Sequence, residues 1–550
     1  MKRSKKVSVA AGIAAATLLG GSLTACGSDD KSGSNNASGN GSNIILTDGT
    51  EPQNPLVTTN TNENGGGRVL DQIYTGLVRY TNDGKVENAV AEKITPNDDA
   101  TEYTIKLKDA WTFTNGEKVT ADSFIDAWNY GAAAKNAQLQ ADFYSPIEGF
   151  DAVSKEGSTE DKMSGLQKVS DLEFKVKLSQ PESSFPVRLG ASPYMPLPKA
   201  AFEDMKAFGE KPIGNGPYKL ADKNGWVHNQ EINLVTNEDY KGENKPKNGG
   251  VTFKMYNNLD TVYTDLQSGN LDLTYNTVPS NAMAVYKDDF PDSHEDKPIA
   301  AIQNVTIPER LAHFGNDEEG KLRREAISLS INRKLVADKI FHGSRVPAKD
   351  FGAPTLGEGG TPDIKGNDVL DNNPEKAKEL WKKADEIKPW SGTFEIAYNA
   401  DGGHKEWVEA VTNDISQTLG IQAQGKSYPT FKAMRDEITN KKINTAFRSG
   451  WQADYPSIAN FLEPQYATGG SSNDGGYSNP EFDKLLKEAA AQTDEKKAQE
   501  TYNKAQAVLM EQLPAIPLFY YAATDAWNTN LSNVAYSWNG TADLPPIEKK

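Results

Sequence analysis

The segment Phe447–Pro456, which reads FRSGWQADYP, contains the residue types best suited to binding a charged ligand. An extended peptide carries an ammonium at one end, a carboxylate at the other and unpaired amides between them, so its site needs an acid, a base and exposed backbone groups. Composition alone leaves a surface ion pair beside a core tryptophan as the alternative. The segment follows a strand predicted over Ile443–Phe447. Its candidate ligand-binding residues are Arg448, Gly450, Trp451, Asp454 and Tyr455.

One phosphate-loop pattern, G-x-x-x-x-G-K-[ST], occurs at Gly420–Ser427. Phosphate binding by such a loop needs a strand before it and a helix after it, so that backbone amides and the helix dipole point at the phosphate. Here the order is reversed, because a helix is predicted over His404–Leu419 and a strand over Ile421–Tyr428. We therefore predict that this segment binds no nucleotide.

The sequence offers little for metal or nucleophilic chemistry. No G-x-S-x-G elbow occurs, and the only cysteine, Cys26, lies near the amino terminus. Abundant Asp and Glu leave a carboxylate dyad open, although no spacing points to one. We expect no cofactor, no metal and no enzymatic activity, with a secreted hydrolase of peptides or glycans as a distant alternative. The five histidines are scattered without the i, i+4 pairing of a helical zinc motif: His228, His294, His313, His342 and His404.

The first 25 residues have the parts of a secretory signal. Basic residues open it, and the apolar run Val7–Leu19 is about 13 residues long, whereas crossing a bilayer takes roughly 20. Leu23–Cys26, which reads LTAC, is similar to a bacterial lipobox. The similarity implies that Cys26 is lipidated and becomes the first mature residue. We therefore expect a lipid-anchored protein at the extracellular face of the bacterial cytoplasmic membrane.

Residues 26–43 follow as a predicted flexible tether, because Gly, Ser, Asn and Asp bury too little apolar surface to order a chain. The whole chain carries a net charge of −17, and removing the four basic residues of the signal leaves −21. Such acidity excludes a nucleic-acid partner, whose phosphates require basic patches. From residue 44 onward about 500 residues remain, which is enough for two to four domains.

Both structural periods occur along this part of the chain. Alternating apolar residues predict strands at Tyr103–Leu107 and Leu172–Leu178. Asn-Pro pairs at 373–374 and 479–480 predict capped helix starts, each followed by apolar residues at helical spacing. A strand at Thr393–Tyr398 completes a strand–helix–strand alternation that indicates α/β architecture.

Residues 44–540 resemble the extracellular solute-binding proteins that serve oligopeptide and dipeptide permeases. The resemblance depends on the order of many short motifs, each weak alone. These are Glu51–Leu56, Trp111–Gly116, Val119–Phe124, Asn215–Leu220, Gly269–Asp272, Leu322–Ala326, Ile331–Arg333, Tyr398-Asn399 with His404-Lys405, Gly450-Trp451 with Ala453–Tyr455, and Pro514–Pro517.

The resemblance implies roles for two of the candidate residues. Asp454 matches the aspartate that holds a peptide's amino terminus, and Arg448 matches the arginine that helps to hold the carboxyl end of short peptides. Two positions depart from the family pattern. Thr439 stands where a second basic residue is expected, and Phe341 stands where a lysine is expected, with His342 and Arg345 as neighbours. These departures leave open how the carboxyl end is held and which peptide lengths bind.

The resemblance also implies an α/β, two-lobed, periplasmic-binding-protein-like fold with a hinge and an extra subdomain, giving three domains in a pear-shaped molecule. Ligand would be captured in the cleft between the lobes. The expected division is lobe I from residues 44–82, 193–297 and 515–550, the extra subdomain from 83–192 and lobe II from 298–514.

The function that the resemblance implies is capture of peptides, oligopeptides above all, for the permease subunits of an ATP-driven importer. We expect a monomer. Other branches of the family bind metal chelates, haem, sugars or amino-acid derivatives, and a peptide-signal sensor would share the same residues, so these alternatives stay open.

Overall fold

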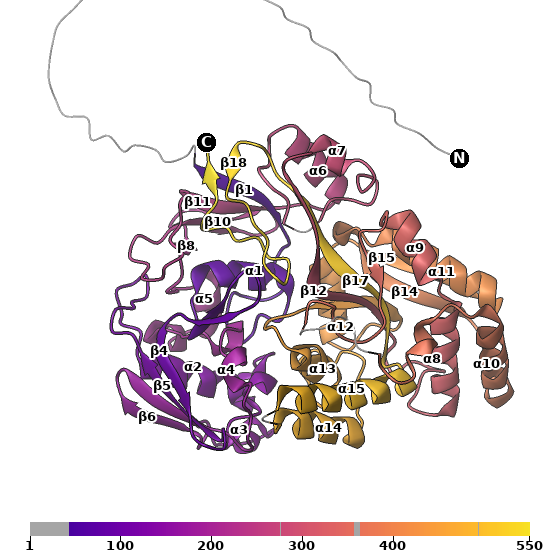
Figure 1. The fold of residues 1–550 in the computed structure, drawn as a ribbon, viewed down its shortest axis with the longest axis horizontal. Coiled ribbons are helices and arrows are strands. Elements are labelled where there is room, and N and C mark those ends of the chain that lie inside the picture. Colours follow the sequence, from indigo (N-terminus) through magenta and orange to yellow (C-terminus); the bar gives the residue numbers. More distant parts are fainter. Residues whose placement is uncertain (1–42, 276, 357–362, 493) are drawn as a thin grey trace, which may run out of the picture. The chain divides into compact units, whose positions relative to one another are not determined.

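The computed structural model describes residues 43–275, 277–356, 363–492 and 494–550 (Figure 1). The predicted signal, Cys26 and the tether up to residue 42 lie outside the described residues. Within the described ranges, no helix is both long and apolar enough to cross a membrane.

The first lobe is built on a five-stranded sheet with the order β1-β11-β10-β8, in which β9 also pairs with β10. β1 runs parallel to β11, and the other pairs are antiparallel. Along β10, Ile232 and Leu234 alternate with polar residues and are buried, as expected for a strand with one face on a core. The strands are β1 (Ile44–Gly49), β8 (Tyr218–Leu220), β9 (Trp226–Val227), β10 (Glu231–Thr236) and β11 (Gly250–Met255), and the helices are α1 (Asn64–Ile73), α5 (Met205–Glu210), α6 (Leu259–Gln267) and α7 (Tyr286–Asp289).

A subdomain is built on an antiparallel sheet with the order β4-β5-β7-β6. The strands predicted from alternation are confirmed, because Ile105 of β5 pairs directly with Phe174 of β7 and both are fully buried. Trp128 of α2 packs on Phe174, with ring centroids 5.7 Å apart. The elements are β4 (Ala91–Pro96), β5 (Glu102–Leu107), β6 (Leu166–Ser170), β7 (Glu173–Lys177), α2 (Ala121–Ala132), α3 (Phe150–Ser154) and α4 (Phe185–Arg188), preceded by the hairpin β2 (Val78–Tyr80) and β3 (Val86–Asn88).

The second lobe is built on a six-stranded mixed sheet with the order β13-β17-β12-β16-β14-β15. Its strands are β12 (His294–Thr306), β13 (Val346–Pro347), β14 (Thr393–Asn399), β15 (Gln422–Tyr428), β16 (Ala446–Gln452) and β17 (Ala515–Ala526). Its helices are α8 (Glu318–Ser330), α9 (Arg333–Ile340), α10 (Pro374–Ile387), α11 (Lys405–Leu419), α12 (Phe431–Thr439), α13 (Ile458–Tyr466), α14 (Pro480–Ala490) and α15 (Glu495–Gln512). The short elements η1 (Ala134–Asn136), η2 (Ala141–Tyr144), η3 (Ser192–Tyr194), η4 (Lys199–Phe202), η5 (Asn367–Leu370), η6 (Ala400–Gly402), β18 (Leu531–Ser532) and β19 (Glu548–Lys549) complete the fold.

The two longest strands, β12 and β17, connect the lobes (Figure 1). They pair antiparallel over most of their length, and the register shifts between Pro298 and Ile302. Where β17 ends, the amide of Thr274 donates to the carbonyl of Ala526, which attaches the strand to the first lobe. A paired ribbon interrupted by a bulge is a suitable hinge, because the bulge breaks the ladder and bends the strand locally.

Local signals placed several of the second-lobe elements correctly. Asn373 and Asn479 cap α10 and α14 as predicted, since each side chain accepts hydrogen bonds from backbone amides of the first helical turn. The phosphate-loop look-alike has the predicted helix-before-strand order, with α11 ahead of it and Lys426 inside β15. The strand predicted over Ile443–Phe447 was misplaced. It covers Ala446–Gln452, because pairing with β12 continues as far as Gln452 opposite Ala301.

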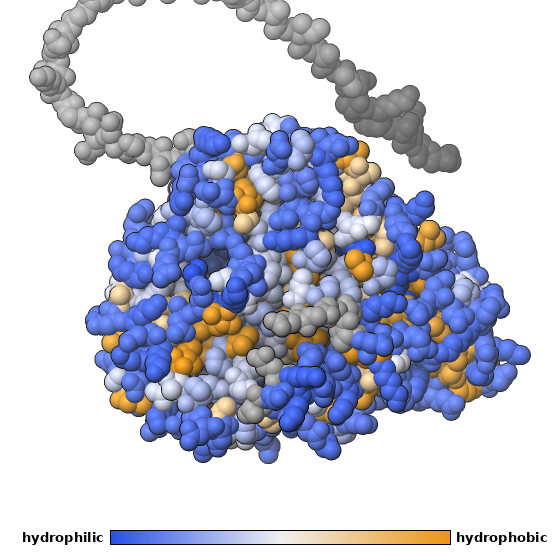
Figure 2. All heavy atoms as spheres, viewed as in Figure 1, coloured by the Kyte–Doolittle hydropathy of each residue, from blue (hydrophilic) through white to orange (hydrophobic). Residues whose placement is uncertain are grey.

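The surface agrees with the acidic, polar composition. Figure 2 shows a face that is mostly hydrophilic, with small separate hydrophobic patches. Scattered apolar patches of this kind are normal on soluble domains.

Candidate ligand-binding cleft

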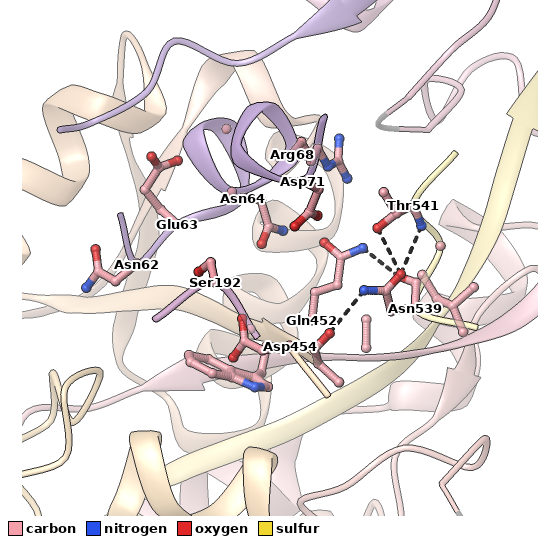
Figure 3. Close-up of a pocket in the computed structure, with 18 of the residues that line it drawn as sticks. Asn62, Glu63, Asn64, Arg68, Asp71, Ser192, Gln452, Asp454, Asn539 and Thr541 are labelled. Carbon is pink, nitrogen blue, oxygen red and sulfur yellow. Dashed lines mark hydrogen bonds between the residues drawn. The ribbon is translucent and has the colours of Figure 1, made fainter. Parts of the chain in front are cut away.

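A cavity of about 540 Å³ lies between the lobes. Helix α1 and the loop before it line one side, and β16 with the residues after it lines the other. The hinge strands contribute Ile299, Ala301 and Tyr521 to the lining, so the bulge in β12 borders the cavity. Residues 537–545 close a further side (Figure 3).

Asp454 provides an acidic group held in a fixed orientation within this cavity. The side chain of Asn460, which is fully buried, donates to Asp454 Oδ2 at 2.9 Å and accepts from the Asp454 amide at 2.8 Å. Trp451 Nε1 donates to the same Asn460 oxygen at 2.9 Å. Burial raises the pKa of Asp454 to about 6, against the opposing hydrogen bond from Asn460. Asn460 therefore positions a carboxyl group that gains from meeting a cation.

A second carboxyl group, that of Asp71 on α1, faces the same space from the first lobe (Figure 3). Its side chain is exposed to the cavity. Desolvation by the protein around the cavity, together with the nearby charge of Asp454, raises the pKa of Asp71 to about 7, and Arg68 acts against the rise. Sequence reasoning missed Asp71, because its role depends on a helix and a strand end that lie far apart in the chain.

The edge of β16 beyond Phe447 is open. β14 pairs only with Ala446 and Phe447, and no strand in the described part of the chain pairs with that side of Arg448–Gln452. The other side pairs fully with β12, and a Cβ on Gly450 would lie 2.6 Å from the carbonyl oxygen of Ile302. Glycine is therefore required for this close approach. An unpaired strand edge beside a cavity can bind an extended backbone by strand addition.

Arg448 provides the basic group at the other end of this edge. Its Nε donates to Asn399 Oδ1 at 2.8 Å, and its guanidinium lies 4.9 Å from the ring centre of Phe431. Burial lowers its pKa to about 10, so it stays charged at neutral pH. Among the described residues Arg448 and Asp454 form no ion pair with each other, although both line the cavity. This arrangement disfavours the alternative of a surface ion pair.

The remaining two candidates differ in position. Trp451 lines the cavity and packs against the second-lobe core. Tyr455 is buried under Arg188, whose guanidinium lies 5.5 Å from its ring centre, and it is not among the described residues that line the cavity. Tyr455 therefore supports the cleft from behind.

The departures from the family pattern also have structural counterparts. Thr439 accepts a hydrogen bond from Gln53 at 3.2 Å, and the nearby cation, Arg435, is paired with Asp474 at 2.6 Å. Phe341 is buried in the second-lobe core, and His342 is exposed and not among the described lining residues. Arg345 does line the cavity. In the described ranges, no group of three or more His, Cys, Asp or Glu residues could hold a metal ion.

Residues 85–473 match the family model described as the middle region of bacterial extracellular solute-binding proteins, family 5. The oligopeptide-binding protein OppA of Bacillus subtilis is 27% identical over 492 residues, covering 87% of this chain and 88% of its own. The periplasmic oligopeptide-binding protein OppA of Salmonella typhimurium is 28% identical over 469 residues, covering 82% of each chain.

Solved structures show the same fold. Haemophilus influenzae OppA in complex with the peptide RPPGFSPFR superposes with a TM-score of 0.82 at 23% identity, covering 92% of this chain and 99% of its own. Burkholderia pseudomallei OppA also gives a TM-score of 0.82, at 22% identity with the same coverage. The predicted fold class, two α/β lobes with a hinge and an extra subdomain, is confirmed.

Proposed function

The chain belongs to family 5 of the bacterial extracellular solute-binding proteins, and on that premise we propose that it captures peptides, oligopeptides above all, in the interlobe cleft. It delivers them to the permease subunits of an ATP-driven importer. It acts by binding and release, with no chemical step, no cofactor and no metal. The relatives named as oligopeptide-binding proteins support this substrate class.

One observation carries the proposal. The open edge of β16 connects a fixed carboxyl group, Asp454, to a buried guanidinium, Arg448, within one cavity. An extended peptide has the complementary order of groups, an ammonium, then backbone amides, then a carboxylate. Backbone pairing recognises any sequence, and hydrated space beside the edge accepts varied side chains. The site therefore suits peptides as a class.

Ligand would drive closure because it contacts both lobes only when they are shut. A ligand shifts a conformational equilibrium by its difference in affinity for the two states. The second lobe already contacts the subdomain and the first lobe directly, since the amide of Ser471 donates to Asp142 at 3.0 Å and Gln53 donates to Thr439. The bulged β12–β17 ribbon would absorb the motion.

Native mass spectrometry of the purified protein tests this function, because a co-purified ligand identifies its own class. We expect a mixture of short peptides, which mild denaturation and refolding removes and added oligopeptides restore. A metal chelate, haem, sugar or amino-acid derivative in the cleft, with no affinity for peptides, would overturn the proposal. Turnover of a peptide panel would favour the hydrolase alternative.

The proposal includes a lipid anchor at Cys26 and attachment to the outer face of the cytoplasmic membrane, with the protein acting as a monomer. It also keeps the division into lobe I (44–82, 193–297 and 515–550), subdomain (83–192) and lobe II (298–514). Cys26→Ser should abolish labelling by a fatty-acid analogue while the protein still folds. Equal label on both forms would contradict the anchor.

A further inference from the structure

Arg345 is a buried cation with an unsatisfied donor in the cleft. It follows α9 and is 8% exposed, and its guanidinium lies between two aromatic rings, 4.0 Å from the ring centre of Phe341 and 4.0 Å from that of Tyr521. The two rings hold the guanidinium in place, and Tyr521 is also a side-chain hydrogen-bond partner of Arg345. Its Nη1 makes no hydrogen bond to any described residue, although the side chain lines the cavity.

Two other buried arginines of the second lobe, Arg333 and Arg324, donate mainly to backbone carbonyls. Arg333 donates to the carbonyls of Pro517, Ser328 and Leu370 and to the Ser328 hydroxyl. Arg324 donates to three carbonyls. Arg323 also has an unsatisfied Nη1, but it is paired with Glu319 and Asp385 and is not among the described lining residues of the cavity. Arg345 combines an unsatisfied Nη1 with a place at the cavity wall and no ion pair in the described ranges, which indicates a missing acceptor.

Two further donors face the same region. Arg448 lines the cavity nearby and, like Arg345, forms no ion pair within the described ranges. His404 also lines the cavity, and its Nδ1 accepts a hydrogen bond from Trp407 Nε1 at 3.1 Å. Because an indole N–H can only donate, Nδ1 carries no proton and the neutral ring holds its proton on Nε2. Burial, reinforced by the charges of Arg448 and Arg345, keeps the pKa of His404 well below its usual value, so the ring stays neutral at pH 7.

We propose that Arg345 is a second carboxylate-binding residue of the cleft, acting with Arg448 and the His404 Nε2–H on one carboxylate of the ligand. This inference rests on the proposed function and names how the carboxyl end is held. The carboxylate is either the carboxyl terminus of a short peptide or an acidic side chain close to it. Arg345 thereby supplies the positive charge that is absent at Phe341, four residues earlier in the chain.

Calorimetry with matched peptides tests the inference. Tri-, tetra- and penta-alanine are titrated as free acids and as carboxyl-terminal amides into wild type, Arg345→Gln and the control His342→Asn. In wild type, amidation should weaken binding by about 10- to 100-fold at one or more lengths, the usual size for a hydrogen bond to a charged group. Arg345→Gln should lose most of that discrimination. His342→Asn should keep it, because His342 is exposed and asparagine tolerates its left-handed backbone with φ of 48°.

Further measurements distinguish the two sources of the carboxylate and control for a variant that does not fold. A further series of amidated peptides that end in Glu identifies the source of the carboxylate. If these peptides regain affinity in wild type but not in Arg345→Gln, the carboxylate that Arg345 binds belongs to a side chain. If Arg345→Gln does not fold, Arg345→Met carries the same comparison, since its flexible apolar stem fills the space between the two rings. Equal discrimination in wild type and variant would overturn the role of Arg345 and leave the proposed function intact. If wild type binds none of the peptides, the proposed function and this inference both fail.

Discussion

Two sets of buried arginines are stabilised in opposite ways. Arg188, at the end of α4, donates from Nε to Glu182 at 2.5 Å and pairs through Nη1 with Glu463 of α13 at 2.8 Å. Arg345 and Arg448, in the cleft, also lie against aromatic rings but form no ion pair within the described residues. The first arrangement is electrostatically complete, whereas the second lacks an anion.

The difference distinguishes an arginine that stabilises the fold from arginines that can bind a ligand. A buried charge with its partners in place holds two elements together, here the subdomain and the second lobe. A buried charge without them is costly unless a ligand completes it. The acidic side of the cleft follows the second pattern, because Asp454 has a neutral partner, Asn460, and no ion pair with a described residue.

The largest expected effect comes from breaking the complete set. Arg188→Gln leaves Glu182 and Glu463 without their cation, and removing one partner of a buried pair typically reduces the free energy of unfolding by about 3–5 kcal/mol. Urea unfolding of the peptide-free protein measures the loss. The matched control is Arg79→Gln, whose partner Glu87 is exposed, so a change below about 1 kcal/mol is expected. Equal losses in the free energy of unfolding from the two substitutions would mean that the buried ion pairs contribute no more than the exposed one.

Next in size is Asp454→Asn, which should weaken peptide binding. Removing one partner of a buried, hydrogen-bonded charge pair costs about 2–5 kcal/mol, and asparagine keeps the shape, so we expect the lower half of that range. Calorimetry of free and amino-acetylated peptide against wild type and variant forms a double-mutant cycle. A coupling energy near zero would mean that Asp454 does not bind the amino terminus.

Arg448→Ala should act at the opposite end of the ligand. We expect a loss of about 1.5–3 kcal/mol for di- to tetrapeptides and a smaller loss for longer peptides, whose carboxylates would lie beyond its reach. Affinities measured across peptide length check this. A uniform loss at all lengths would instead indicate that Arg448 supports the cleft through Asn399 without contacting the carboxylate.

Sequence reasoning succeeded where the determinants are local. Asn373 and Asn479 mark helix starts because a cap and its amides lie within three residues of each other. β14 and α11 were placed within one residue, since their periods are contained in the segments themselves. The order of conspicuous motifs indicated the fold and drew attention to Asp454 and Arg448.

The features that sequence reasoning missed depend on contacts between residues that lie far apart in the chain. β16 extends to Gln452 because β12, about 150 residues earlier, supplies the pairing partner. Asn460 has no sequence signal beyond its position six residues after Asp454. Neither Asp71 nor the Arg188–Glu463 pair can be inferred from spacing, since each joins segments from different parts of the fold.

The smallest expected effect concerns pH and the unpaired carboxyl groups. The pKa values of Asp454 and Asp71, about 6 and about 7, lie above the value of roughly 4 for an unfolded aspartate. An ammonium binds the ionised carboxylates, so peptide affinity should rise between pH 5 and 7, by about tenfold for one group with a pKa near 6. Calorimetry at pH 5, 6 and 7 measures the rise.

The stability of the peptide-free protein should change in the opposite direction. Between pH 4 and 7 the native state holds more protons on these groups than the unfolded state, so their contribution to stability is lost as the pH rises. Asp142 and Asp525, with pKa values raised by burial to about 6 and about 8, add to this slope but are common to wild type and Asp71→Asn. Between pH 4 and 7 the Tm of Asp71→Asn should therefore fall less steeply than that of wild type. Its peptide affinity should still rise near pH 6, where Asp454 ionises, but should lose the part of the rise near pH 7 that Asp71 contributes. Profiles that superpose on those of wild type would mean that Asp71 acts independently of the ligand's ammonium, leaving Asp454 as the acidic group of the cleft.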